Sequence, residues 1–309
     1  MGKSPTTRVR RLMRLLWNCH QACLTRLAAM LQDVTRAIIM KTILFLFATV
    51  PFFSQAAEKL QWQVLKSSVF AGTVRQYAFH KTPGLDAAKA AALMVFQDGH
   101  SYVEGNFHAP EVIDKLVQSG AVPPMLLVFV SPGVFADDLA EPQGWNTPKG
   151  LKSNRSVEYD TLSPLYAEML EKEILPLAGK VQLLSADPTQ RAICGTSSGG
   201  ICAFTVAWER PDLFAKVMSH VGSFTNIRGG HVYPSLIRKE KSRPLRVFLQ
   251  DGTNDLDNEH GNWFLANQQM AAALKFRHYD YTFVTDDSEH GGKGGGKIFA
   301  DSVKWLWRK

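Results

Sequence analysis

From about residue 61 onward, short runs of apolar or β-branched residues alternate with longer stretches whose apolar positions recur with a helical period. Segment 73–79 alternates with a period of two, which predicts an early strand at a sheet edge. Nearly continuous apolar runs, typical of interior parallel strands, lie at 91–96, 125–130 and 245–249. Helical spacing marks 110–118, 160–175, 199–209, 262–276 and 296–307. This alternation predicts an α/β fold with a mostly parallel central sheet flanked by helices, in a single domain.

The first 57 residues differ in charge from the rest of the chain. They hold eight Lys or Arg residues and one acid, Asp33, whereas the remainder holds 27 basic and 27 acidic residues. The formal net charge of +7 therefore comes from the leader, and the neutral body gives no reason to expect a nucleic-acid partner. With 45% hydrophobic and 20% charged residues, the composition is that of a folded protein and excludes a disordered or collagen-like chain.

The leader contains the pattern of a signal peptide. Met40 and Lys41 precede an apolar run at 42–53, and small residues then stand at Ser54 and Ala56. The run is shorter than the ~20 residues of a membrane-spanning helix, so we predict cleavage after residue 56 and no stable membrane span afterwards. The expected location is periplasmic or extracellular, with the folded domain at 57–309.

The residues before Met40 are harder to assign. Signal peptides begin near their Met, so we interpret 1–39 as an over-extended reading frame and Met40 as the start. Two alternatives stay open: an arginine-rich targeting or membrane-surface helix, and a twin-arginine export signal at Arg10 and Arg11. Removal of the leader leaves Cys194 and Cys202, which we expect to be buried thiols and not a disulfide.

A candidate nucleophile follows the strand-like run 191–194. Gly195-Thr196-Ser197-Ser198-Gly199 matches the G-x-S-x-G pattern and precedes a helical stretch. Such a turn holds a serine on a sharp bend, and the glycines let the backbone fold tightly enough to present the hydroxyl. The pattern predicts Ser197 as the nucleophile, with a simple structural turn as the alternative.

A serine nucleophile needs a base, and the base needs an orienting carboxylate, in the chain order Ser, acid, His. The strand at 245–250 runs into a loop with Asp251, Asp255 and Asp257; Asp255 is the first choice, Asp257 the second and Asp251 the third. His290 follows the predicted strand 279–285 and is flanked by glycines, which makes it the expected base. The rival histidines, expected to be structural or on the surface, are His220, His231 and His260.

An oxyanion hole requires one backbone N–H after the nucleophile and one from the loop after the third strand. Ser198 supplies the first. The loop after Phe96 contains Gly99 and His100, and we expect the second N–H from one of these two residues. A plain turn is the alternative.

Together these segments resemble a known family. Met94 to Gly99, Gly195 to Gly199, Asp251 to Asp255 and Glu289-His290 are similar to the esterases related to esterase D, enterochelin esterase and the feruloyl or acetyl-xylan esterase domains of xylanases. The resemblance implies an α/β-hydrolase fold without a large lid, supports Ser197, Asp255 and His290 as the triad, and implies no metal or organic cofactor. Feruloyl esterases often carry a histidine-glycine pair where this chain has Asp98-Gly99.

Polar loops with aromatic residues are expected to build the substrate pocket. Arg155 and Arg228 are candidates to grip a carboxylate or sugar hydroxyls, while Trp145 and Tyr159 are candidates to stack on a ring. The alternative for Arg155 is a local ion pair with Glu158. The predicted function is a secreted serine esterase acting on a small-molecule or polysaccharide ester, namely a plant polysaccharide ester or a siderophore trilactone. An acyltransferase or thioesterase, or a non-catalytic binding protein of the same fold, stays open.

Overall fold

The computed structural model describes residues 60–139, 147 and 149–309, together with scattered helical residues between 13 and 35. The predicted signal peptide at 40–56 and the candidate Trp145 lie outside the described residues. Residues 59–309 form a unit of their own, and everything below concerns that unit. Among the residues described, no helix is both long and apolar enough to cross a bilayer.

A ten-stranded sheet forms the centre of this unit, with strand order β12-β9-β8-β7-β3-β4-β2-β5-β6 and β1 paired to β2. Neighbouring strands from β12 to β4 are parallel, and the pairs β4–β2, β2–β5, β5–β6 and β1–β2 are antiparallel. The strands are β1 (Gln63–Lys66), β2 (Thr73–Lys81), β3 (Ala92–Gln97), β4 (Met125–Val130), β5 (Val134–Phe135), β6 (Lys152–Ser153), β7 (Arg191–Thr196), β8 (Lys216–His220), β9 (Arg246–Asn254) and β12 (Asp280–Glu289).

Helices cover both faces of the sheet. On one face, α2 (Gly99–Glu104), α3 (Ala109–Gln118) and α10 (Gly292–Trp307) pack with Phe96, Phe129 and Phe248 in one buried cluster. The other cluster holds Val128 and Leu249. The elements on that face are α4 (Arg155–Asp160), α5 (Leu165–Met169), the π-helix η1 (Leu170–Ile174), α6 (Leu175–Val181), α7 (Ser198–Glu209), α8 (Tyr233–Lys239) and α9 (Trp263–Phe276).

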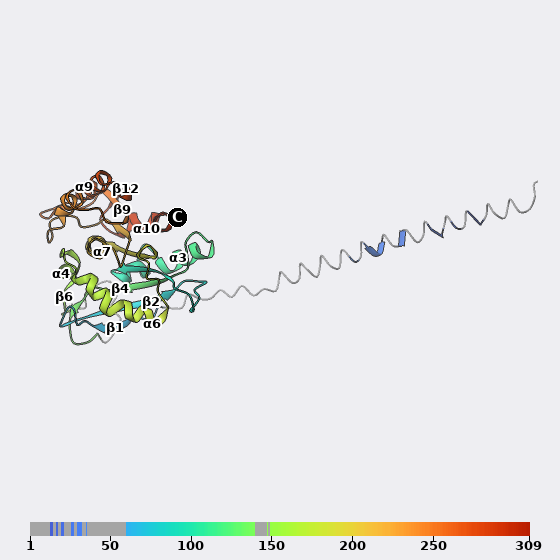
Figure 1. Ribbon diagram of the computed structural model, residues 1–309, viewed down its shortest axis with the longest axis horizontal. Coiled ribbons are helices and arrows are strands. Elements are labelled where there is room, and N and C mark those ends of the chain that lie inside the picture. Colours follow the sequence, from blue (N-terminus) through green and yellow to red (C-terminus); the bar gives the residue numbers. More distant parts are fainter. Residues whose placement is uncertain are drawn as a thin grey trace, which may run out of the picture. The chain divides into compact units, whose positions relative to one another are not determined.

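Figure 1 shows the C-terminal elements β9, β12, α9 and α10 gathered at one end of the unit, with β1 and β2 at the other. A short hairpin of β10 (Asp257–Asn258) and β11 (Gly261–Asn262) follows β9, and the 3₁₀ turns η2 (Pro188–Gln190) and η3 (Gly230–Val232) precede β7 and α8. The architecture is the predicted α/β arrangement with a mostly parallel sheet.

Three local predictions need correction. β2 is not an edge strand, since it pairs with β4 and β5 along one side and with β1 along the other. The predicted helix 160–175 is divided: α4 ends at Asp160, the chain is extended at Thr161, and a new helix begins after Pro164. Proline has no N–H and fixes φ, so it fits a helix start better than an interior. Finally, β9 extends four residues past the predicted strand end at 250, and β12 extends four residues past the predicted strand end at 285.

Candidate active site

Ser197 lies on a sharp turn between β7 and α7. Its φ and ψ are 59° and −123°, a conformation that a non-glycine residue rarely adopts. The turn is tight because a Cβ on Gly195 would fall 2.0 Å from the carbonyl oxygen of Gly199. A Cβ on Gly200 would meet Ser219 Oγ at 2.5 Å. Gly195 of the G-x-S-x-G pattern and the adjacent Gly200 therefore have no room for a side chain.

The structure brings Ser197, His290 and Asp255 together in one hydrogen-bonded chain. Ser197 Oγ lies 2.9 Å from His290 Nε2, and His290 Nδ1 lies 2.5 Å from Asp255 Oδ1. Asp255 comes directly after β9 and His290 directly after β12, so the parallel strands place both side chains at the same sheet edge as Ser197. The side chain of Asp255 is fully buried, whereas that of His290 is 23% exposed.

Of the rival acids, Asp251 hydrogen-bonds to Asp255 and does not contact His290 among the hydrogen bonds described, whereas Asp257 and the rival histidines lie elsewhere. Asp257 is exposed in the β10–β11 hairpin. His220 is fully buried behind the nucleophile turn, where its Nδ1 hydrogen-bonds the Tyr102 hydroxyl. His231 is exposed. The ion pair described for His260 joins its Nε2 to Glu259 Oε1 at 3.9 Å.

Asp255 is ionised in this arrangement. Burial alone would raise the pKa of its carboxyl, but hydrogen bonds from His290 and Asp251 outweigh burial and hold the pKa below its ordinary value. An ionised Asp255 accepts the Nδ1 hydrogen of His290, so Nε2 is free to accept the hydroxyl hydrogen of Ser197.

The spacing of acid and base depends on Gly252. A Cβ on this residue would fall 1.9 Å from the carbonyl oxygen of Ser288. Ser288 stands two residues before His290, and Gly252 three residues before Asp255. Any side chain at position 252 would therefore push the ends of β9 and β12 apart.

Two further side chains complete the surroundings of the serine, and the sequence pattern gave no signal for them. Ser223 Oγ lies 3.2 Å from Ser197 Oγ and 3.1 Å from the indole nitrogen of Trp263. The indole can only donate, so Ser223 accepts from Trp263 and keeps its own hydrogen for Ser197. The Trp263 ring also packs edge-on against His290, with 5.8 Å between ring centroids.

The turn between β3 and α2 lies beside the nucleophile turn. A Cβ on Gly199 would fall 3.0 Å from Asp98 Oδ2, and a Cβ on Gly99 would fall 2.7 Å from the Val130 backbone nitrogen. Asp98 has a φ of 53°, and its N–H donates to the Tyr159 hydroxyl at 3.2 Å. Ser198 is the first residue of α7 and Gly99 is the first residue of α2. Backbone N–H groups at the start of a helix have no acceptor within the helix.

His100 does not direct its side chain toward the serine. The ring stacks on Trp62 with 3.5 Å between centroids, and Nε2 hydrogen-bonds Gln76 Oε1 at 2.9 Å. Burial lowers the pKa of His100 to about 4, so the ring is neutral at physiological pH. Only its backbone N–H is left as a candidate oxyanion donor.

Asp98 is held by Arg155. The guanidinium donates two hydrogen bonds to the Asp98 carboxylate, from Nε at 2.8 Å and from Nη2 at 2.7 Å. The alternative of a local ion pair between Arg155 and Glu158 is wrong, because Glu158 binds Arg75 instead. Arg155 also packs over the ring of Tyr159, with 5.3 Å to the centroid.

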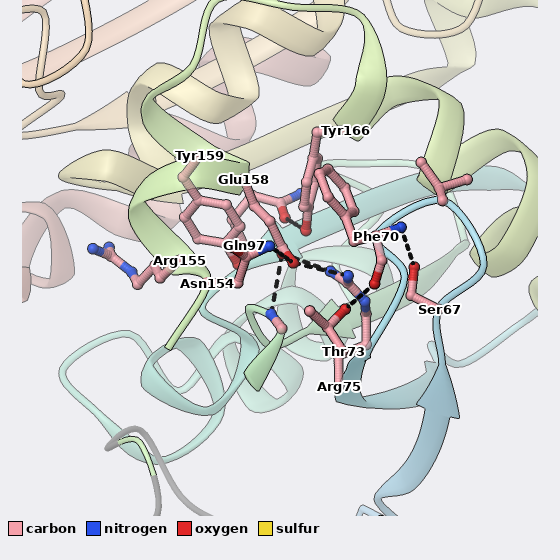
Figure 2. A network of polar contacts seen from close by, with 12 residues as sticks. Ser67, Phe70, Thr73, Arg75, Gln97, Asn154, Arg155, Glu158, Tyr159 and Tyr166 are labelled. Carbon is pink, nitrogen blue, oxygen red and sulfur yellow. Dashed lines mark hydrogen bonds and ion pairs between the residues drawn. The ribbon is translucent and has the colours of Figure 1, made fainter. Parts of the chain in front are cut away.

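Glu158 lies at the centre of a buried polar network that fixes α4 to the sheet. Figure 2 shows Arg75 pointing toward its carboxylate and Arg155 pointing away from it. Arg75 donates two hydrogen bonds, at 2.8 and 3.0 Å, and both side chains are completely buried. The Gly133 N–H and Asn154 Nδ2 donate to the same carboxylate at 3.0 Å each. Four donors thus satisfy this buried charge.

The remaining predicted substrate residues lie in different environments. Tyr159 is fully buried, so the prediction that its ring stacks on a substrate is wrong; the hydroxyl supports the β3–α2 turn instead. Arg228 is exposed and its Nε donates to Ser156 Oγ at 3.2 Å. The sequence pattern missed Asp160, which is buried and interacts with the hydroxyls of Ser198 and Ser156. Burial raises the pKa of Asp160 despite those hydrogen bonds.

Cys194 and Cys202 are buried free thiols, as expected from the sequence. Within the described ranges, no three His, Cys, Asp or Glu side chains converge as metal ligands would. The polar groups around Ser197 are an imidazole, a carboxylate and backbone N–H groups, an arrangement that could perform acyl transfer.

The fold is similar to the folds of esterases whose structures have been solved. The enterobactin esterase of Shigella flexneri, in the presence of enterobactin, matches with a TM-score of 0.64 and 20% identity over 82% of this chain. The match covers 59% of that protein, so this chain spans less than two thirds of its length. A ferulic acid esterase of the fungus Anaeromyces mucronatus matches with a TM-score of 0.59 and 16% identity, over 80% of this chain and 90% of that chain.

Among curated proteins, the uncharacterized protein YbbA of Bacillus subtilis is 21% identical over 243 residues, covering 76% of this chain and 93% of its own length. A family model described as "Putative esterase" matches residues 78–297, a span that includes the nucleophile turn, Asp255 and His290. The protein thus belongs to this esterase family and shares the α/β-hydrolase fold of its structural neighbours.

Proposed function

We propose that this protein is a serine esterase that hydrolyses carboxylic esters through Ser197, His290 and Asp255. The observation that carries the proposal is the unbroken hydrogen-bonded chain from Ser197 Oγ through His290 to Asp255, with Oγ on a strained turn. Membership in an esterase family supports the same reaction class.

The geometry supports a two-step reaction. His290 Nε2 takes the hydroxyl proton of Ser197 as Oγ attacks the ester carbonyl, and Asp255 stabilises the imidazolium that forms. The N–H groups of Ser198 and of Gly99 or His100 would stabilise the oxyanion. His290 then gives its proton to the leaving alcohol, leaving an acyl-enzyme. A water molecule, deprotonated by the same His290, releases the acid and restores Ser197.

The proposed substrates are a plant polysaccharide ester, feruloyl or acetyl, or a siderophore trilactone of the enterobactin type. The structural neighbours named for enterobactin and ferulic acid support these two classes. Arg228, exposed near Asp160, is the candidate side chain to contact a polar or anionic part of the substrate.

Turnover of p-nitrophenyl acetate and butyrate tests the reaction class, with Ser197→Ala as the matched control. Feruloyl, acetyl-xylan and catecholate trilactone esters, assayed side by side, then select the substrate. Burst release of p-nitrophenol without turnover, with turnover restored by an added alcohol or thiol, would favour an acyltransferase. Faster hydrolysis of a thioester than of the matching oxygen ester would favour a thioesterase. The absence of both burst and turnover would contradict the esterase proposal and favour a binding role.

We further propose that the protein is exported and that its mature chain begins near Ala57. The pattern at 40–56 supports this proposal. Mass spectrometry of the N-terminus, on protein recovered outside the cytoplasm, tests it; a mature protein that retains residues 1–39 would contradict it.

A further inference from the structure

A second buried carboxyl stands directly behind Asp255. Asp251 lies on β9 with its side chain fully buried, on the sheet face that carries Leu249 and α9. Its Oδ1 accepts the Gly252 N–H at 2.8 Å, and its Oδ2 accepts from Asn267 Nδ2 at 2.7 Å. The side chains of Asp251 and Asp255 also hydrogen-bond to each other.

The orientation of Asn267 fixes the direction of these bonds. Its Nδ2 also donates to the carbonyl oxygen of Gly222 at 2.9 Å, and a carbonyl can only accept. The amide nitrogen therefore points toward Asp251, which accepts from it. Both Asp251 oxygens are thus acceptors toward neutral donors, and no full positive charge is supplied by these contacts.

The second oxygen of Asp255 is the unsatisfied atom of the pair. Oδ1 accepts from His290, whereas Oδ2 is buried and no N–H or neutral hydroxyl of the described residues donates to it. Two ionised carboxylates cannot hydrogen-bond to each other, because neither has a hydrogen to give. One proton on Asp251 satisfies Oδ2 and removes a repulsion between two buried negative charges.

The groups that face Asp251 from other elements leave this assignment unchanged. His220 on β8 and Asp286 on β12 lie on the α10 side of the sheet: an added Cβ on Gly295 would meet His220, and one on Gly294 would meet Asp286. Burial lowers the pKa of His220 to about 3, so it is neutral. The groups on the α9 side are Asn267 of α9, Thr285 in register on β12, Asp255 and, through Asp255, His290.

We propose that Asp251 is a positioning residue, protonated at neutral pH, whose hydroxyl donates to Asp255 Oδ2 and so holds Oδ1 against His290. The proposal rests on the triad assigned above. Burial and the adjacent Asp255 raise the pKa of Asp251 to about 9, in agreement with this geometry. The pair then carries one negative charge, which lies on the carboxylate that stabilises the imidazolium.

A carboxylic acid suits this position better than an amide. The protonated oxygen can donate to Asp255 while its lone pairs accept from a neighbour, whereas an amide NH₂ only donates. Asp251→Asn therefore keeps the hydrogen bond to Asp255, loses one acceptor and no longer titrates. Asp251→Ala removes the donor altogether.

Kinetic pH profiles test the positioning role. The kcat of wild type is expected to fall above about pH 9 as Asp251 ionises, and Asp251→Asn is expected to lose this alkaline fall while retaining at least a tenth of the activity at pH 7. Asp251→Ala is expected to reduce kcat about 30-fold with little change in KM, the size of one lost buried hydrogen bond to a charged group. An alkaline fall that persists in Asp251→Asn, or wild-type kcat in Asp251→Ala, would overturn the proposal.

Infrared difference spectroscopy separates this proposal from the esterase proposal, because it requires no turnover. The wild-type protein at pH 7 is expected to show the C=O stretch of a protonated carboxylic acid, which disappears near pH 9 and is missing in Asp251→Asn. Asp257→Asn, at an exposed position, is the control and should leave the band unchanged. If the Asp251 band is absent from wild type at pH 7, the proposal fails even in a fully active esterase.

Discussion

Ser197 lies between two groups of charged residues that differ in exposure and in origin along the chain. His290 and Asp255 occupy loops after separate strands, and the imidazole reaches the surface with 23% of its side chain exposed. On the other side, Arg75 and Glu158 are wholly buried, and Arg155 clamps an Asp98 side chain that is 3% exposed. A residue that transfers protons, such as His290, must be accessible to the substrate. The buried charges have a different role, which is to fix the position of the β3–α2 turn.

The two groups should therefore respond differently to substitution. Changes among Ser197, His290 and Asp255 remove rate and leave the folded state intact, since these residues form little of the core. Changes in the buried network lower stability or shift the β3–α2 turn.

The largest effect is expected from Ser197→Ala. It removes the nucleophile but no core volume, so kcat for an activated ester should fall about 10⁵- to 10⁶-fold with little change in thermal unfolding. Stopped assays and a melting curve on the same preparation check both. A variant with one hundredth of wild-type kcat would show that another group attacks the ester.

Asp255→Asn should lower kcat about 10³- to 10⁴-fold while the protein stays folded. The amide can donate to His290 Nδ1 and so favours the tautomer that cannot accept the serine proton, and it no longer stabilises the imidazolium. Asp257→Asn is the matched control and should stay within about twofold of wild type, because its side chain is exposed and outside the chain of hydrogen bonds. A dominant effect at Asp257 would displace Asp255 as the acid.

Glu158→Gln should destabilise the protein by about 3–5 kcal/mol, since it leaves the fully buried Arg75 without a counter-charge. Urea unfolding measures the loss. The double variant Arg75→Met with Glu158→Gln removes the unpaired charge, so it is expected to recover part of the lost free energy of unfolding. A double variant less stable than Glu158→Gln would show that the ion pair is not what makes the single change costly.

Arg155→Ala should lower kcat about 10- to 100-fold with little change in KM, because the loss of two hydrogen bonds to a buried carboxylate frees Asp98 and the turn that carries it. Arg155→Lys keeps the charge but not the paired hydrogen bonds, so its kcat should lie between those of wild type and Arg155→Ala. The kinetic split is decisive. A higher KM with unchanged kcat would support the substrate-gripping role expected from the sequence.

The same comparison explains which features could be predicted from the sequence. Strands such as 125–130 are apolar runs between turns, and the glycines around Ser197 have a purely local steric cause, so both are visible in the chain itself. The positions of Asp255 and His290 follow from chain order and strand ends. The α4 boundary was missed because the apolar period continues past it while Pro164 starts a new helix.

The buried network was not predictable in the same way. Arg75 and Glu158 are 83 positions apart, and Asp98 and Arg155 are 57 apart, so no local spacing announces either pair. The local alternative, Arg155 with Glu158, has favourable helical spacing and is still wrong. Tyr159 was expected at the substrate for a related reason: its aromatic ring in a polar segment gave no sign of the packing that buries it.

The close approach at Gly252 has a consequence for how the protein tolerates mutation. A single methyl group at that position would have to occupy space already filled by the Ser288 carbonyl, 1.9 Å away. Relief by parting the ends of β9 and β12 would lengthen the contact between Asp255 and His290. In a library of random variants, residue 252 should therefore be as intolerant of substitution as Ser197, His290 and Asp255, although it bears no functional group.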